Sequence, residues 1–192
     1  MLLVLVSTHA FSATSTPSVY KTTVTKVELC SSSACSDPIV LGSGSKEFDI
    51  ASVSAQADVG TYLNDFTITL GRTYTHVRST INATMTTKGT VDVSGTTCNT
   101  VASPTVAAAS HTATAKTAPS GTLAEMDWVV PNVNGGGDYA NLTQRYNANG
   151  ISKTDGASTF TFTVAIVSPY TPKASDTPKV SIKFDVADTL EA

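Results

Sequence analysis

Few side chains of this sequence could carry out acid–base or nucleophilic chemistry, and they lie far apart in the chain. Beyond the apolar start, the histidines are His76 and His111, and a hydrolytic triad would need one of them beside a serine and an acid. Neither a G-x-S-x-G nor an H-E-x-x-H motif is present. His76 shares the polar face of an alternating segment with Arg78, where a solvated histidine is expected. The pattern predicts a protein that is not an enzyme.

Amide and acidic side chains in two turn-like segments could contribute to a calcium site. Asn134 and Asp138 flank three glycines, and Asp155 precedes Gly156. Calcium is bound by about six to eight oxygens, often from loop carboxylates and carbonyls. Asn and Asp also hydrogen-bond their own backbone in turns, and we favour this ordinary role here. We therefore predict no metal site and no cofactor.

The chain contains three cysteines. Cys30 and Cys35 flank a short spacer, which can bring their Cα atoms within the ~4.4–6.8 Å that a disulfide requires, and we expect them to form one in an oxidising compartment. Metal binding is the weaker alternative, because a second ligand pair is missing. For Cys98 the alternatives are a buried thiol, a bond to Cys30 or Cys35, or an intermolecular disulfide. We predict that Cys98 pairs with neither Cys30 nor Cys35.

The start of the chain indicates export. An apolar run over residues 2–6 is followed by the small residues Ala10, Ser12 and Ala13, an order typical of a secretory signal peptide. The run is too short for a membrane span, which needs ~20 apolar residues. We predict that residues 1–13 are a signal peptide and that the mature chain has no membrane span. The protein is then secreted or held at the cell surface; a buried first strand is the alternative for this segment.

The composition is that of an exported β protein. Only 14% of the residues are charged and the net charge is -3, so the basic patch that nucleic-acid binding requires is not expected. Threonine and serine are abundant, and threonine favours strands, where its methyl group packs and its hydroxyl faces water. Helix-forming residues are sparse, and no stretch has apolar residues at helical spacing.

Several segments alternate between apolar and polar residues as half-buried strands do. They are Val19–Leu29, Phe66–Leu70, Tyr74–Met85, Thr159–Val167 and Val180–Val186. The last two are predicted to form a hairpin. Its inward-facing residues are predicted to share one core: Phe160, Phe162, Ile182 and Phe184.

These segments predict an all-β fold, an antiparallel β-sandwich or jelly roll of about eight to ten strands. Residues 14–192 are predicted to form a single β-sandwich domain. An Ala/Ser/Thr-rich excursion at 96–122 interrupts it, either as thin edge strands or as a linker. A short helix is tolerated only over Tyr139–Tyr146.

Aromatic residues near the predicted loops are candidate ligand contacts. Trp128, Tyr139 and Tyr146 could stack on sugar rings, because aromatic faces bind apolar C–H surfaces. Trp128 is followed by Val129 and Val130, so packing in the core is the favoured role for this residue.

One short segment resembles a known family. Leu70-Gly71-Arg72-Thr73-Tyr74-Thr75-His76-Val77-Arg78 is similar to the G-x-Y-T-x-(I/V)-R start of a strand in prealbumin-like β-sandwich modules of secreted bacterial surface proteins. The resemblance implies a module exposed at a surface or facing a matrix. It implies no reaction and no site residue.

Export, low charge and hydroxyl-rich strands together favour a structural role. We predict a subunit of an extracellular fibre, coat or matrix that self-associates through β-strand contacts, with a carbohydrate-binding surface module as the alternative. In the assembly hypothesis the first strand adds to the sheet edge of a neighbour and fills its pockets with Val19, Val24, Val27 and Leu29. The competing interpretation, which we favour for this strand, is pairing within its own domain.

Overall fold

The computed structural model describes residues 13–52, 67–102, 117–119, 121–133, 142–176 and 186–191, with the backbone alone at 117–119 and 191. The predicted signal peptide lies outside these ranges except for Ala13, so it stays a prediction. Ile182 and Phe184 of the predicted hairpin also lie outside them.

Strand β2 (Val19–Cys30) is the centre of the main sheet and is bonded along both of its edges. On one edge it pairs with β3 (Ile39–Asp49), with register shifts beside Thr25 and between Val27 and Glu28. On the other edge it pairs with β4 (Tyr74–Asn82) and then with β5 (Thr84–Lys88). All of these pairings are antiparallel.

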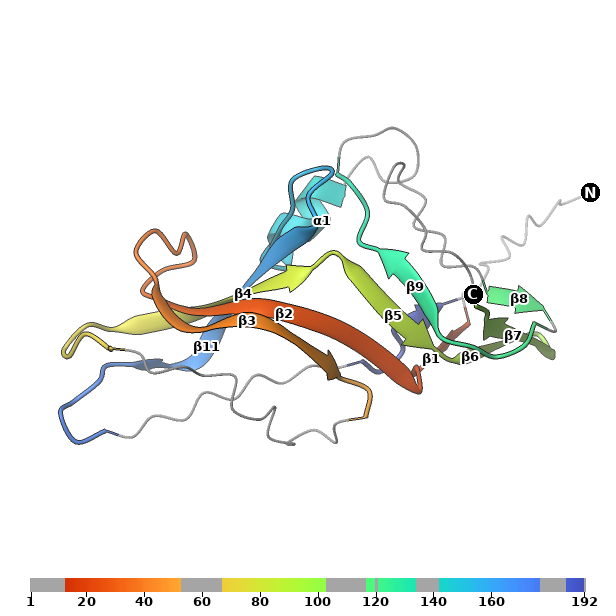
Figure 1. Cartoon of the computed structure of the whole chain (residues 1–192), viewed down its shortest axis with the longest axis horizontal. Helices are drawn as coiled ribbons and strands as arrows, with labels where there is room; N and C mark the ends of the chain where they lie inside the picture. Colours follow the sequence, from red (N-terminus) through yellow and green to blue (C-terminus); the bar gives the residue numbers. More distant parts are fainter. Residues whose placement is uncertain are drawn as a thin grey trace, which may run out of the picture.

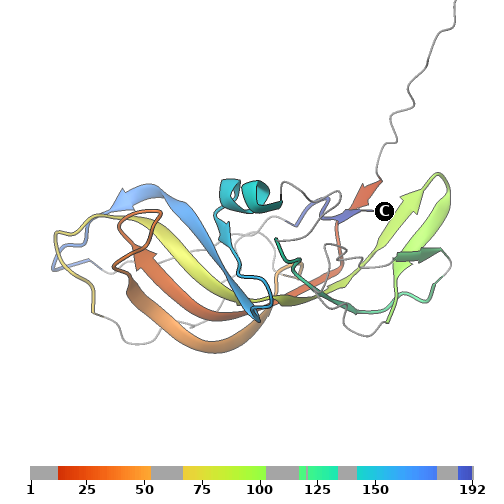
Figure 2. The ribbon, with the colours of Figure 1, turned by 90° about the horizontal axis from the view of Figure 1, so that it is seen from above.

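The main sheet extends outward from this centre to the order β10-β11-β4-β2-β5-β9, with β3 on β2. On one side β11 (Thr159–Tyr170) pairs with β4, and β10 (Ile151–Ser152) pairs with β11. On the other side β9 (Met126–Val129) pairs with β5. Figure 2 shows that the sheet curls as a half-barrel.

Smaller elements lie at the end of the molecule opposite the loops that join β2 to β3 and β11 to the C-terminal segment (Figure 1). A second antiparallel sheet contains β6 (Thr90–Val93), β7 (Thr96–Thr100) and β8 (Thr117–Pro119). The short strands β1 (Thr14–Ser15) and β12 (Leu190–Glu191) pair with each other. Helix α1 (Leu142–Ala148) precedes β10.

The core follows the alternation of the strands. Val77 and Ile81 of β4 are buried, and Phe160 of β11 lies directly opposite Ile81 in the register. Phe162, Val164 and Ile166 pack against the same cluster. The predicted inward face of β11 is therefore confirmed, and the all-β antiparallel fold is confirmed with it.

The long strand predicted over Tyr74–Met85 is broken at Ala83, between β4 and β5. A residue in a regular antiparallel pair directs its N–H and C=O to the same neighbour. Ala83 instead donates its N–H to the carbonyl of Ser158 (2.8 Å), while its own carbonyl accepts the N–H of Val130 (2.8 Å). The break lets one continuous stretch of chain pair with β2 along one edge and with β11 and then β9 along the other.

Other sequence predictions are corrected or refined. Thr67–Leu70 was expected to be part of a strand, but it is irregular; Leu70 is exposed and Gly71 turns with a φ of 73°. Within the excursion at 96–122 the structure has strands β7 and β8. The tolerated helix is found as α1, a few residues later than expected.

We predict that Phe160→Ala lowers the free energy of unfolding by ~3–5 kcal/mol, because it removes a buried aromatic side chain and leaves a cavity. The neighbouring change Thr161→Ala, on the opposite face of β11, should cost about 1 kcal/mol or less. Urea denaturation measures both. Equal losses would contradict the assigned core face.

Candidate functional site

The disulfide predicted from the sequence is present at one end of the curled sheet. Cys30, the last residue of β2, is bonded to Cys35, with their Cα atoms 5.0 Å apart. Cys35 has a φ of 50° and donates its N–H to the carbonyl of Ser32 (3.1 Å). Cys98 is a free, buried thiol in β7, opposite Val91 of β6.

Arg72 joins the disulfide loop to the loop that precedes β4. Its guanidinium donates to the carboxylate of Asp37 (2.6 Å), to the carbonyl of Asp37 (2.7 Å) and to the hydroxyl of Ser31 (2.8 Å). It also lies 5.4 Å from the ring centroid of the fully buried Tyr74. These contacts join the disulfide loop to the loop that precedes β4.

The carboxylate of Glu28 is buried between two cations on the face of β2 that turns away from Val27 and Leu29. It accepts a hydrogen bond from Nε of Arg78 (2.8 Å), and Nζ of Lys26 lies 3.0 Å away. Burial alone would raise the pKa of Glu28, but the hydrogen bonds and charges of Arg78 and Lys26 lower it below its usual value. Two cations beside a buried carboxylate favour its ionised form.

His76 is hydrogen-bonded to its neighbour Thr75, and no acid among the described residues is bonded to it. Its Nδ1 lies 2.8 Å from Oγ1 of Thr75, and this hydroxyl donates its proton to the carbonyl of Ser31 (2.9 Å). The side chain is half-buried in β4, so it is less exposed than the solvated histidine expected from the sequence. His111 lies outside the described residues.

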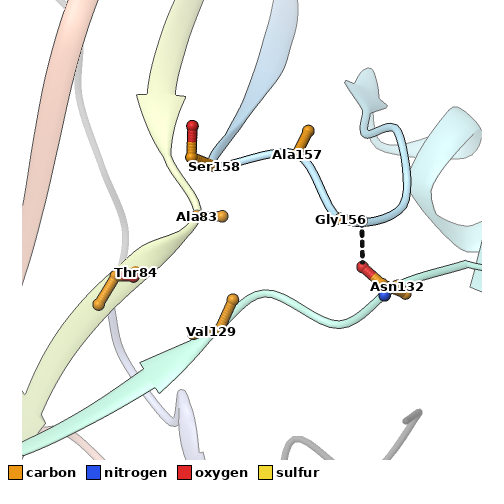
Figure 3. A pocket seen from close by; sticks show the side chains of 7 residues that line it. All are labelled: Ala83, Thr84, Val129, Asn132, Gly156, Ala157 and Ser158. Carbon is orange, nitrogen blue, oxygen red and sulfur yellow. Dashed lines mark hydrogen bonds between the residues drawn. The ribbon is translucent and has the colours of Figure 1, made fainter. Parts of the chain in front are cut away.

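A cavity of about 300 Å³ opens beside the break at Ala83. Figure 3 shows its wall, which comes from the break, the end of β9 and the turn before β11. The lining residues are Ala83, Thr84, Val129, Asn132, Gly156, Ala157 and Ser158.

Lys153 lies beside this cavity and is almost completely buried. Its Nζ donates to Oδ1 of Asn132 (2.8 Å) and lies 3.5 Å from the carbonyl of Thr154. The backbone N–H of Gly156 donates to the same Oδ1 (3.1 Å), the contact drawn in Figure 3. Burial lowers the pKa of Lys153, and the charge of Asp155 acts in the opposite direction.

Asp155 and Tyr146 complete the polar surroundings of Lys153. Oδ1 of Asp155 accepts the N–H of Val133 (2.6 Å), and the phenol of Tyr146 donates to the carbonyl of Pro131 (3.1 Å). Burial, with a further effect from the charge of Asp155, raises the pKa of Tyr146 to about 12. This phenol is therefore neutral and already bonded to the backbone.

The calcium candidates are not brought together in the described part of the chain. Asp155 bonds the backbone N–H of Val133, as an aspartate in a turn does, while Asn134 and Asp138 lie outside the described ranges. No group of three or more His, Cys, Asp or Glu side chains suited to a metal was found among the described residues.

The two aromatic candidates within the described residues, Trp128 and Tyr146, pack against the core. Trp128 packs against the core and meets Tyr20 edge-on, with ring centroids 6.5 Å apart. Tyr146 packs against the same core, and Tyr139 is outside the described residues.

The proposed assembly strand lies inside the chain's own sheet. Val24, Val27 and Leu29 of β2 are buried in the core, and Val19 pairs with Lys88 of β5. These side chains therefore do not fill the pockets of a neighbour in this fold. The interpretation that we favoured for this strand, pairing within its own domain, is the arrangement found.

Sequence reasoning missed Lys153 and Asn132. The only signal near them was the Asp155-Gly156 turn, which indicated a tight bend but not that a lysine would be buried beside it. The asparagine lies in the connection after β9 and the lysine in the turn after β10, so no periodic pattern relates the two.

Comparison with known proteins found no matching family model, no matching curated protein and no matching solved structure. The similarity of residues 70–78 to prealbumin-like modules stays a prediction. In the structure this segment is a turn at Gly71 followed by the start of β4. No helix among the described residues is long and apolar enough to cross a membrane.

For the cysteines, we predict that alkylation of the denatured but unreduced protein labels Cys98 alone, because Cys30 and Cys35 are bonded to each other. Under native conditions Cys98 should react slowly, because it is buried. Peptide mapping by mass spectrometry reads both results. A crosslinked peptide that contains Cys98 would show the pairing to be wrong.

For the buried charges, Glu28→Gln should lower the free energy of unfolding at neutral pH by about 1.5–3 kcal/mol, since it removes hydrogen bonds to charged groups. The lowered pKa of Glu28 means that its contribution is present above the unfolded-state pKa and is lost as the pH falls through the folded-state pKa. Unfolding measured between neutral and acid pH should therefore show a shallower acid dependence in Glu28→Gln. The exposed Glu47→Gln is the control, and a Glu28→Gln curve parallel to wild type would refute this role.

Proposed function

We propose that the protein is an exported, non-enzymatic structural protein, a subunit of an extracellular fibre, coat or matrix whose copies meet through β-strand contacts. The observation that carries the proposal is an open edge of the main sheet at β9. The disulfide and the hydroxyl-rich strands support the extracellular setting.

The disulfide supports export because such bonds persist in oxidising compartments and are rare in the cytosol. Cys30 and Cys35 close a small loop whose residues Ser31–Ala34 are exposed, while both cysteine side chains are buried. The bond therefore supports a setting outside the cytosol.

The open edge at β9 follows from the direction of its backbone groups. The bond from the N–H of Val130 to the carbonyl of Ala83 sets the pattern of the β5–β9 pair, so Trp128 and Met126 direct their backbone groups towards β5. Asp127 and Val129 direct theirs away from the sheet, and no described residue bonds to them there. An unpaired edge of this kind can pair with a strand of another chain.

The edge of the sheet at β11 is less suitable for strand addition. Beyond Ala165 the strand bulges away from β4 and rejoins it at Tyr170. Val167 in the bulge is fully exposed, and Pro169 has no N–H to donate. Bulges and prolines of this kind protect sheet edges from pairing with other chains. Of these two edges, β9 is therefore the better candidate for a contact between copies.

Carbohydrate binding is the alternative proposal. It has less support, because the packing of Trp128 on Tyr20 leaves no stacked aromatic surface in the described part of the chain. Binding to a glycan array by protein that remains monomeric at all concentrations would favour it over assembly.

To test assembly, we compare Val129→Pro with Val129→Thr. Proline removes the outward N–H of β9 but no bond to β5, whereas threonine keeps the N–H and the β-branched shape. Wild type and Val129→Thr should form concentration-dependent assemblies in sedimentation velocity and filaments or sheets in negative stain. Val129→Pro should stay folded, and the concentration that it needs for assembly should rise at least tenfold.

Two outcomes would contradict the proposal. Wild-type protein that is monomeric at all accessible concentrations would remove the basis for a structural subunit. Assembly that is equally strong in Val129→Pro, with circular dichroism unchanged, would show that β9 is not the contact.

A further inference from the structure

We propose that the folded chain cleaves its own peptide bond between Asp37 and Pro38, in the loop between β2 and β3 (Figure 1). The carboxylate of Asp37 is the nucleophile, and the guanidinium of Arg72 stabilises the negative charge that develops on the carbonyl oxygen of Asp37. Each chain undergoes this step once and without turnover. The inference concerns chemistry within one chain and does not depend on the proposed function.

The bond joins the two residue types that make a peptide bond easiest to break. The sequence contains a single Asp-Pro pair, at residues 37 and 38. The side chain of an aspartate can attack its own carbonyl carbon through a five-membered ring, so the nucleophile and its target are already held together. The nitrogen of proline belongs to a tertiary amide, and when protonated it leaves as a secondary amine.

Arg72 contacts both reacting groups of Asp37. Its Nη1 donates to Oδ2 of the carboxylate (2.6 Å), and its Nη2 donates to the backbone carbonyl oxygen (2.7 Å). A donor at a carbonyl oxygen stabilises the negative charge that appears there when a nucleophile adds to the carbon. Oδ1 of Asp37 accepts no hydrogen bond from a described residue, and it is the atom that attacks.

The guanidinium of Arg72 is fixed in this position before the reaction begins. Its Nη2 also donates to Oγ of Ser31 (2.8 Å), in the loop closed by the disulfide. The guanidinium lies 5.4 Å from the ring centroid of Tyr74, which is fully buried. A donor that other contacts already hold in place needs no reorganisation when charge develops in front of it.

The solvent can supply the acid and the water that the reaction needs. The side chain of Asp37 is 79% exposed, whereas that of Arg72 is 24% exposed. Arg72 therefore covers one side of Asp37, and most of the aspartate side chain faces water. Hydronium can protonate the nitrogen of Pro38 from this side, and a water molecule can reach the intermediate.

The reaction balances with water as its one co-reactant. A lone pair of Oδ1 forms a bond to the carbonyl carbon of Asp37, and the carbonyl electron pair moves onto the oxygen beside Arg72. The carbonyl then re-forms, and the C–N bond breaks with its electron pair on the nitrogen of Pro38, which takes a proton from hydronium. Water opens the cyclic anhydride to two carboxylates and releases two protons. One proton replaces the proton used, and the other converts the amine to its ammonium form.

The cleaved chain is expected to stay assembled as two pieces. Strand β2 precedes the cut, and it is bonded along its two edges to β3, β4 and β5, which all follow the cut. The disulfide lies wholly before the cut and does not join the pieces. Cleavage would create a new carboxyl end at Asp37 and a new amino end at Pro38, at the end of the molecule opposite the β1–β12 pair (Figure 1).

The first test follows the wild-type, full-length protein at a mildly acidic pH at which circular dichroism shows it to be folded. Non-reducing denaturing gels and mass spectrometry should reveal one fragment that ends at Asp37 and another that begins at Pro38. The same protein denatured in urea at the same pH gives the rate of the unassisted bond. Cleavage of the folded protein should be faster than this by about tenfold or more.

Variants test the two assigned roles. Asp37→Glu changes an exposed side chain and keeps a carboxylate for Arg72, but its attack requires a six-membered ring, so cleavage should slow by about tenfold. Arg72→Gln removes the charged donor and should slow cleavage by about tenfold or more. Asp92→Glu, at an exposed aspartate in β6, is the matched control and should be cleaved at the wild-type rate.

The proposal is overturned if the folded wild-type chain stays intact, or if it is cut no faster than the denatured chain. It is overturned equally if Asp37→Glu is cut at the wild-type rate, a result that does not depend on whether Arg72→Gln folds. A folded Arg72→Gln protein that is cut as fast as wild type would remove the role of the guanidinium and with it the proposed mechanism. A fragment that begins at Pro38, formed faster in the folded protein and slowed in both variants, establishes the cleavage.

Discussion

Hydrogen bonding along both edges of β2 is the constraint on which the rest of the fold depends. Because β3 occupies one edge while β4 and β5 occupy the other, the strand has no edge left over most of its length, and its apolar side chains must fill the chain's own core. The register shifts in β2 let Val24, Val27 and Leu29 all face inward although their spacing is uneven. Glu28 then points to the opposite face, where Arg78 and Lys26 compensate its charge.

The break at Ala83 is a consequence of the same arrangement. β4 and β5 both pair with β2 but have different neighbours on their far sides, β11 and β9, and the chain must change partner between them. Ala83 makes this change by directing its N–H to one neighbour and its carbonyl to the other. The cavity, the open edge of β9 and the contact between Lys153 and Asn132 all lie around this one residue. A small buried side chain at this position allows the three strands to approach.

The sequence predicted the strands whose alternation is regular and could not predict their neighbours. A period of two identifies the buried face of β11 and β4, because each side chain is assigned to one face or the other. It carries no information on which edges are paired, so β2 could be read either as a strand for a neighbour or as the centre of its own sheet. The short disulfide loop was predictable from local spacing. Lys153 and Asn132 were not, since two irregular connections bring them together and neither contains a recognisable motif.

The pairing of β1 with β12 bears on how this protein could be attached to something else. Thr14 lies opposite Glu191, so the chain enters and leaves the described fold at one end, while the loop between β2 and β3, which holds the disulfide, lies at the other (Figure 1). A tether at either terminus would therefore hold the same end and present the same loops outward. Copies joined in tandem would lie side by side and would not extend end to end. Joining the termini by a short linker and opening the chain elsewhere would preserve every strand of the main sheet.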